Sequence, residues 1–412
     1  MTHRRDWLRA VLGAGAATCG GLAWAQEPAA GDPSTSRRTV RRPVLPDPTR
    51  NALRPVLEPW ETRPPEDARA RMLLEEVRAR HKLPGLVGAI IKGPAVVSVA
   101  AVGVRKAGED DPFRTTDRIH LGSCTKAMTA TLIATLYEEG ALGASSTLAE
   151  VFPDYADRMH PDFRGATLSH LLTHRAGLPH DADWWGAPGL TPTEKRYAVL
   201  RESCSVPPRS LPGRKYEYSN VGYVLAGLMA ERVTGASWEN LTRARIFEPL
   251  NMYTAGFGAP GMDASSREPQ PYGHQRTLGR LKPIRHDNAP VMGPAGTVHC
   301  SILDWAKFAI AHLRGERPGA RLLMPSTFRD LHTPAPGTEY GGGWLVLDRP
   351  WAGGKALNHA GSNTMWYANA WLAPARDFGV LVATNVGGGS TDKAADEAVG
   401  ALLGRYREAF AG

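Results

Sequence analysis

Ser123 and Lys126 stand three residues apart in the stretch at 122–126, which reads GSCTK. Three residues are nearly one helical turn, so the two side chains face the same way if this stretch opens a helix. A serine hydroxyl becomes a good nucleophile when a neighbouring base takes its proton, and the N–H groups of a first helical turn favour the developing negative charge. The spacing therefore indicates nucleophilic catalysis at Ser123, although a serine that only caps a core helix gives the same pattern.

A second stretch, Y-S-N at 218–220, could supply further catalytic groups. In an extended segment, residues two apart point to the same side, so Tyr218 and Asn220 would face one cleft together while Ser219 points back. A phenol beside a lysine can act as a base, and an amide can hold a substrate carbonyl or the lysine. A plain turn ahead of a helix is the alternative for this tripeptide.

A third stretch, H-A-G-S at 359–362, lies near the end of a predicted strand. His359 and Gly361 share one face of that strand, where the imidazole can meet a substrate and the glycine lets it approach the backbone. The N–H of Ser362 would then form an oxyanion hole with the N–H of Ser123. A structural histidine inside a strand is the alternative.

The elements that must position these residues follow from hydrophobic periodicity. Helices are predicted over 66–82, from Ser123 to Gly140, and over 168–174, 221–234, 301–313 and 392–410. Strands are predicted over 86–92, 96–105, 343–347, 356–361, 368–373 and 379–385. Strands at both ends with helices between them predict one sheet, built from 84–105 and 340–412, with a mainly helical part inserted at about 125–335. Together these form one domain over 66–412.

The start of the chain predicts export. A twin arginine at Arg4 and Arg5 precedes a weakly apolar run, and Ala23 and Ala25 supply a small-residue cleavage site. We expect a twin-arginine signal peptide at 1–25, a periplasmic protein that starts near Gln26, and a tether rich in proline and arginine at 26–65.

Composition sets further bounds. The 412 residues, 42% hydrophobic and 22% charged, suit a globular protein, and no later stretch is apolar enough to span a membrane. The net charge of +8 comes with arginines crowded at 37–54 and with no nucleic-acid-binding module, so nucleic acid is not an expected partner. The three cysteines beyond the signal peptide permit one disulfide, whose pair stays open: Cys124, Cys204 and Cys300.

S-x-x-K, Y-S-N and H-x-G, in this order and widely spaced, resemble the serine β-lactamase and penicillin-binding-protein superfamily. The class C β-lactamase-related branch, which includes esterases, D-aminopeptidases and DD-peptidases, is the most similar. The stretches LSHLLTHRAGL at 168–178, YSNVGY at 218–223, VTG at 233–235 and IFEPLNM at 246–252 also resemble that branch. The resemblance runs from about Arg69 to the C-terminus.

The resemblance implies an acyl-enzyme mechanism without a metal or cofactor. Ser123 would attack a carbonyl, Lys126 and Tyr218 would move protons, and Asn220 would help to place the substrate. Water would then release the acyl group. The implied fold, of the α/β (α+β) class, is an antiparallel sheet flanked by helices, with the site between it and a helical domain.

The third motif departs from the Lys-Thr-Gly of true β-lactamases. A lysine there offers a fixed positive charge to a substrate carboxylate, whereas His359 near neutral pH offers only part of one. We therefore expect an esterase or a D-amino-acid peptidase with weak β-lactamase activity, acting on a small molecule or a peptide. The physiological substrate and the oligomeric state stay open.

Other classes of function fit less well. No serine lies in the G-x-S-x-G pattern of α/β-hydrolases. His170 and His174 are four residues apart, as in zinc hydrolases, but Leu171 stands where those enzymes have glutamate. A penicillin-binding domain that is acylated without turnover is the remaining alternative.

Overall fold

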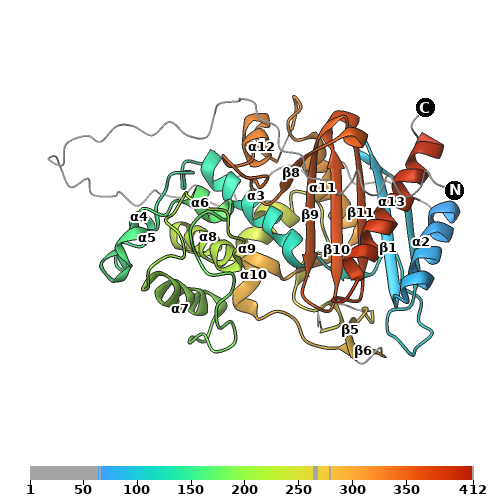
Figure 1. The fold of residues 1–412 in the computed structure, drawn as a ribbon, viewed down its shortest axis with the longest axis horizontal. Coiled ribbons are helices and arrows are strands. Elements are labelled where there is room, and N and C mark those ends of the chain that lie inside the picture. The colour runs from blue at the N-terminus through green and yellow to red at the C-terminus, as the bar shows by residue number, and fades with distance from the viewer. Residues whose placement is uncertain (1–63, 65, 263–267, 278–279, 321, 411–412) are drawn as a thin grey trace.

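The computed structural model describes residues 64, 66–262, 268–277, 280–320 and 322–410. The predicted signal peptide at 1–25 lies outside the described residues, as does the predicted tether at 26–65 except for residue 64. The described part contains a six-stranded antiparallel sheet, helices on both of its faces and a mainly helical region beside it (Figure 1). The predicted fold class is therefore confirmed.

The large sheet joins the two ends of the described chain. Its strand order is β2-β1-β11-β10-β9-β8, and β1 pairs antiparallel with β11, so strands from both ends of the described chain lie side by side. Gly93, with φ at +60°, makes the turn of the β1–β2 hairpin. The strand bounds are Gly85–Lys92 (β1), Ala95–Gly103 (β2), Leu345–Arg349 (β8), Gly354–Ser362 (β9), Tyr367–Ala373 (β10) and Phe378–Thr384 (β11).

One face of this sheet is covered by the first and last helices, α2 (Ala68–His81) and α13 (Thr391–Phe410) (Figure 1). Asp67 caps α2, because its side chain accepts hydrogen bonds from the backbone N–H groups of Arg69 and Ala70. Apolar side chains of both helices and of the sheet form one core cluster here. This layer lies on the side of the sheet that faces away from the helical region.

The other face is covered by α11 (Ile302–Arg314) and leads into the helical region. Ser301 caps α11 by accepting a hydrogen bond from the N–H of Asp304. The remaining helices are α3 (Thr125–Glu138), α4 (Leu148–Val151), α5 (Pro161–Arg164), α6 (Leu168–Leu172), α7 (Pro192–Cys204), α8 (Asn220–Thr234), α9 (Trp238–Thr242), α10 (Gly293–Gly296) and α12 (Pro325–Leu331). Two small sheets complete the fold: β3 (Arg118–His120), β7 (Val298–Ser301) and β4 (Gly256–Phe257), and β5 (Gly273–Thr277) with β6 (Arg280–Ile284).

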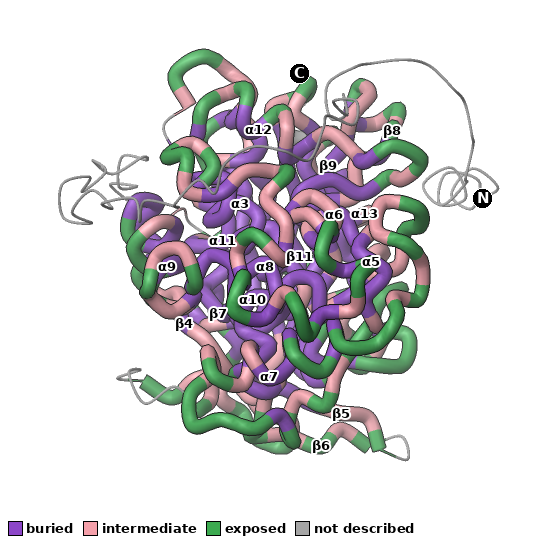
Figure 2. Tube along the Cα trace, turned by 90° about the vertical axis from the view of Figure 1, so that its left-hand side faces the viewer, coloured by how far each residue is buried: buried purple, intermediate pink, exposed green. Residues whose placement is uncertain are grey.

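Burial follows these layers. Buried residues run through α3, α8 and the central strands, whereas exposed residues lie mainly in loops and around α5 and β6 (Figure 2). Cys124, Cys204 and Cys300 are buried and none is joined to another, so no disulfide forms among them. Among the described residues, no helix combines the length and apolarity needed to cross a bilayer.

Candidate active site

Ser123 lies at the point where the chain turns from β3 into α3. A single 3₁₀ turn, Gly122–Cys124, joins the strand to the helix, and Gly122 has φ at +51°. A Cβ on Gly122 would lie 2.3 Å from the backbone nitrogen of Ser362, so only glycine fits there. The turn therefore presses directly against the end of β9.

The end of β9 makes the reciprocal contact. A Cβ on Gly361 would lie 2.6 Å from the backbone nitrogen of Ser123 and 2.1 Å from the carbonyl oxygen of Leu121. The glycine thus brings two backbone segments together that are more than two hundred residues apart in the chain. The N–H groups of Ser123 and Ser362 therefore lie in adjacent backbone segments, as the predicted oxyanion hole requires. The Ser362 hydroxyl is engaged elsewhere and donates to the carbonyl oxygen of Trp366 at 2.7 Å.

Lys126 follows Ser123 by one turn and is fully buried. Its Nζ lies 3.1 Å from Ser123 Oγ. Nζ also donates to the side-chain oxygen of Asn220 at 2.7 Å and to the carbonyl oxygen of Ala295 at 2.8 Å. Burial lowers the pKa of Lys126 to about 7, while the charge of Asp181 acts in the opposite direction. A substantial fraction of this lysine is therefore neutral near pH 7.

Asn220 and Tyr218 come from the segment that enters α8. Ser219 caps this helix through the N–H of Gly222, and its hydroxyl donates to the carbonyl oxygen of Pro179 at 2.5 Å. Ser219 therefore points away from the site, as the sequence predicts. On the other side, the amide group of Asn220 donates to Asp181 Oδ1 at 2.8 Å while its oxygen accepts from Lys126.

The Tyr218 phenol lies beside Ser123, and Lys126 Nζ lies 4.9 Å from the centre of the Tyr218 ring. Burial raises the pKa of Tyr218, and the interaction with the Ser123 hydroxyl offsets only part of that rise. Tyr218 is therefore protonated near neutral pH. It can donate a proton in this site more readily than it can remove one.

His359 is buried, with only 4% of its surface exposed. Burial and the nearby Lys126 lower the pKa of His359 to about 3. The prediction of a partial positive charge near pH 7 is therefore wrong. Both ring nitrogens are also engaged: Nδ1 lies 2.6 Å from the carbonyl oxygen of Ala360, and Nε2 lies 2.9 Å from the hydroxyl of Tyr340. The ring lies in the site as a neutral, hydrogen-bonded group.

Several residues of the site were not predicted from the sequence. Asp181 joins it through Asn220, and the Ala295 carbonyl joins it through Lys126. Tyr340 joins it through His359, and its ring also packs 4.5 Å from the ring centre of His174. No short motif marks these positions, because each is defined by a contact with a distant part of the chain.

The histidines of the zinc-hydrolase alternative have other partners. His170 Nδ1 accepts from the N–H of Thr167 at 3.2 Å, and the buried His174 accepts at Nδ1 from the N–H of Ser219 at 3.1 Å. Across the part of the chain that the structure describes, no group of three or more histidine, cysteine or acidic side chains lies together as metal ligands would. These imidazoles therefore contribute to helix capping and to the wall around Tyr218.

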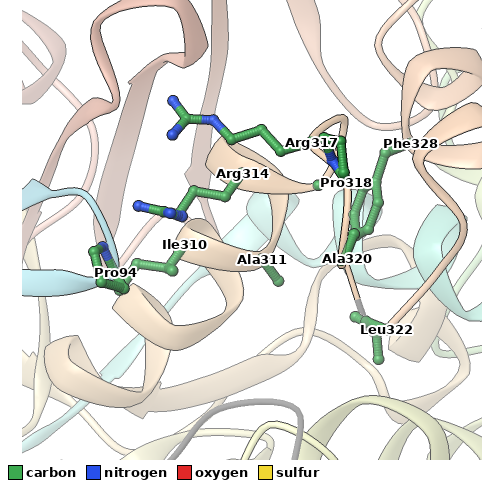
Figure 3. A pocket seen from close by; sticks show the side chains of 11 residues that line it. Pro94, Ile310, Ala311, Arg314, Arg317, Pro318, Ala320, Leu322 and Phe328 are labelled. Atoms are coloured by element: carbon green, nitrogen blue, oxygen red, sulfur yellow. The ribbon is translucent and has the colours of Figure 1, made fainter.

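A pocket of about 180 Å³ lies between the β1–β2 turn and the segment that links α11 to α12 (Figure 3). Arg314 and Arg317 line it, and both guanidinium groups donate to Asp377 Oδ2, at 2.8 and 2.7 Å. None of the predicted site residues lines this pocket. The candidate active site is therefore the group around Ser123.

The comparisons with known proteins agree with this geometry. The β-lactamase family model matches residues 70–405, a region that includes every predicted site residue. Penicillin-binding protein 4 of Amycolatopsis lactamdurans is 27% identical over 360 residues, which cover 82% of this chain and 91% of that protein. Esterase EstB of Burkholderia gladioli is 25% identical over 364 residues, which cover 77% of this chain and 90% of that esterase.

Among solved structures, the octameric penicillin-binding protein homologue from Pyrococcus abyssi superposes with a TM-score of 0.68. It is 27% identical in sequence, and the match covers 81% of this chain and 77% of that structure. The likeness thus extends over the sheet and the helical region together.

Proposed function

This chain belongs to the β-lactamase family, and we propose that it uses Ser123 as the nucleophile of a serine hydrolase that acts on esters or D-amino-acid peptides. The family includes both esterases and penicillin-binding proteins among the similar sequences. Acyl transfer through a serine is the chemistry these share. The choice of substrate within the family is what the proposal adds.

The observation that carries the proposal is the set of partners around Lys126 Nζ. Two of its three partners, Asn220 Oδ1 and the Ala295 carbonyl, can only accept hydrogen bonds. A neutral amine has two N–H groups and one lone pair. When both N–H groups point to these acceptors, the lone pair points to the hydroxyl of Ser123. Lys126 is then oriented as a base, and its pKa of about 7 keeps it available near neutral pH.

In the first step, Lys126 takes the proton of the Ser123 hydroxyl as Oγ attacks the substrate carbonyl carbon. The negative charge moves to the carbonyl oxygen, where the N–H groups of Ser123 and Ser362 stabilise it. The bond to the leaving group then breaks, and that group takes a proton from the protonated Tyr218, which Lys126 reprotonates. The acyl group is left on Ser123.

In the second step, a water molecule attacks the acyl carbonyl. Lys126 takes one proton from the water as its oxygen bonds to the carbonyl carbon. The bond to Ser123 Oγ then breaks, Oγ receives that proton from Lys126, and the acid product leaves. Asn220 holds Lys126 in place throughout, since its amide oxygen accepts from Nζ while its amide nitrogen donates to Asp181.

The neutral state of His359 supports substrates without a carboxylate beside the reacting bond. A cation at this position would attract such a carboxylate, whereas the neutral imidazole of His359 offers no positive charge. Esters and neutral peptide ends therefore fit better than β-lactams, whose carboxylate would face an uncharged wall. We expect slow turnover of cephalosporins.

The place of action in this proposal is the periplasm. It is supported by the twin arginine and the small-residue cleavage site in the first 25 residues. Fusion of residues 1–30 to a reporter that is active only after twin-arginine export would test it. A twin-lysine variant of the leader is the control and should keep the reporter inside the cell.

The central experiment compares the wild type with Ser123→Ala on a short-chain p-nitrophenyl ester. We expect Ser123→Ala to lose essentially all activity. Ser205→Ala, which removes an exposed hydroxyl that donates to the Glu202 carbonyl, should keep it. Full activity of Ser123→Ala would show that another residue is the nucleophile. Stable acylation by a penicillin with no ester turnover would instead favour the penicillin-binding alternative.

A further inference from the structure

A buried chain of hydrogen bonds lies behind the turn that carries Ser123. His120, the last residue of β3, is fully buried and accepts at Nδ1 from the N–H of Gly122, at 3.1 Å. Its Nε2 lies 2.9 Å from Asp287 Oδ2. Since Nδ1 is an acceptor, the ring proton is on Nε2, and His120 donates it to Asp287. The carboxylate thus fixes the imidazole that holds the backbone just before Ser123.

The same carboxylate holds the other side of the oxyanion hole. Asn363, which follows Ser362, donates from its side chain to Asp287 Oδ1 at 2.6 Å. The side-chain oxygen of Asn363 accepts from the N–H groups of Met365 and Trp366, at 3.1 and 2.9 Å. Asn363 therefore stabilises the turn between β9 and β10, and Asp287 holds the Asn363 side chain in place.

Asp287 is suited to this role by its position and charge. It lies in the loop between β6 and α10, belongs to neither segment of the oxyanion hole, and has a side chain that is only 7% exposed. Its two oxygens accept from two different segments, one each. Hydrogen bonds to a carboxylate are stronger than neutral ones, particularly when they are buried.

We propose that Asp287 is a positioning residue that holds the N–H groups of Ser123 and Ser362 at a fixed separation, through His120 on one side and Asn363 on the other. The inference rests on the proposed function, because it assumes that these two N–H groups form the oxyanion hole. Asp287 touches neither substrate nor nucleophile. It affects the reaction rate by holding the two backbone segments that carry these N–H groups at a fixed separation.

Asp287→Asn is the test, because it keeps the shape and replaces one acceptor oxygen with an NH₂ group. That group must face the Nε2–H of His120 or the NH₂ of Asn363, so one of the two links is lost. We expect kcat/KM for the p-nitrophenyl ester to fall about 10- to 100-fold, mainly through kcat, because a small displacement of an oxyanion donor has effects of this size.

Asp304→Asn is the matched control. Asp304 is also a buried carboxylate, 4% exposed, but it accepts from Thr254 and Lys307, away from the oxyanion segments. Both variants should lower the melting temperature, whereas only Asp287→Asn should lower kcat. His120→Gln should also slow the reaction. The double variant His120→Gln, Asp287→Asn should be little slower than either single variant, because both substitutions break the same chain of hydrogen bonds.

A fluorophosphonate probe gives a second readout that does not depend on the choice of ester. Ser123 Oγ would bond to phosphorus, the phosphorus–fluorine bond would break with loss of fluoride, and the serine proton would pass to Lys126. The labelling rate should fall in Asp287→Asn as kcat does, and it should not change in Asp304→Asn.

Wild-type rates in Asp287→Asn, or equal loss in Asp304→Asn, would overturn the positioning role while leaving the proposed function intact. Labelling and ester turnover that persist in Ser123→Ala would overturn the proposed function, and the inference about Asp287 with it.

Discussion

Replacing Asp181 with asparagine should move the acid limb of the pH–rate profile to lower pH. Lys126 must lose its proton to act as a base, so kcat/KM should rise with pH through an apparent pKa of about 7 in the wild type. Asp181 is charged at this pH: burial raises its pKa, but hydrogen bonds from Asn220, His180 and Trp184, together with the charge of His180, leave the pKa below its usual value. Its negative charge favours the protonated lysine, so removing that charge should favour the base.

The size of the shift follows from the geometry. Asn220 separates the two charges, with one hydrogen bond of 2.7 Å to Lys126 and another of 2.8 Å to Asp181. Unit charges roughly 7 Å apart, at an effective dielectric constant of about 20 to 40, interact by about 1 to 2 kcal/mol. Because the side chain of Asp181 is 47% exposed, we take the lower end, which corresponds to about one pKa unit.

The assay measures kcat/KM for a p-nitrophenyl ester between pH 5 and pH 9, with the background taken from Ser123→Ala. The amide side chain in Asp181→Asn keeps an oxygen that can accept from Asn220, so the geometry is preserved. Asp183→Asn removes the same charge from the same loop, and Asp183 bonds instead to the N–H of Gly186. An unchanged or higher apparent pKa in Asp181→Asn, or an equal fall in Asp183→Asn, would refute the assignment of the base.

The remaining predictions concern Gly361, the buried pair of His312 and His332, and His359. Gly361→Ala should reduce activity about 100-fold, because its Cβ would meet the backbone of Leu121 and Ser123, whereas Gly165→Ala, with open space around its Cβ, should retain activity in the same ester assay. His312 Nδ1 lies 2.9 Å from His332 Nε2, and burial lowers the pKa of both rings, so the unfolded chain gains protons below about pH 6.5 that the folded chain does not take up. The free energy of unfolding, from urea titrations at pH 8 and pH 5, should therefore fall on acidification, and the fall should be smaller in His312→Gln; an equal fall would contradict this reasoning. The ratio of ester to cephalosporin turnover should stay high and nearly constant from pH 6 to pH 8, because His359 stays neutral throughout; a sharp gain in cephalosporin turnover towards pH 6 would show that this ring becomes charged.

Local sequence signals predicted the main elements well. The six strands of the large sheet and helices α2, α3, α6, α8, α11 and α13 lie within a few residues of the predicted ranges. The helix α7 was missed, although Thr191 and Glu194 form a capping box around Pro192 at its start. The strands β3, β4 and β7 are two to four residues long, too short for any periodic pattern to mark them.

Within the site, the sequence by itself determined the pairing of Ser123 with Lys126, because three residues in a first helical turn bring their side chains together whatever surrounds them. It also determined that Tyr218 and Asn220 would point away from Ser219, since that depends only on an extended backbone.

Only the tertiary structure decided the ionisation of these groups. The pKa of Lys126 depends on how deeply it is buried and on Asp181, and the neutrality of His359 depends on burial and on Lys126. The link through Asp287 likewise joins three segments that are far apart in sequence. The burial of a residue and the effect of nearby charges on its pKa both depend on many residues that are distant in the sequence. A local motif therefore cannot encode them.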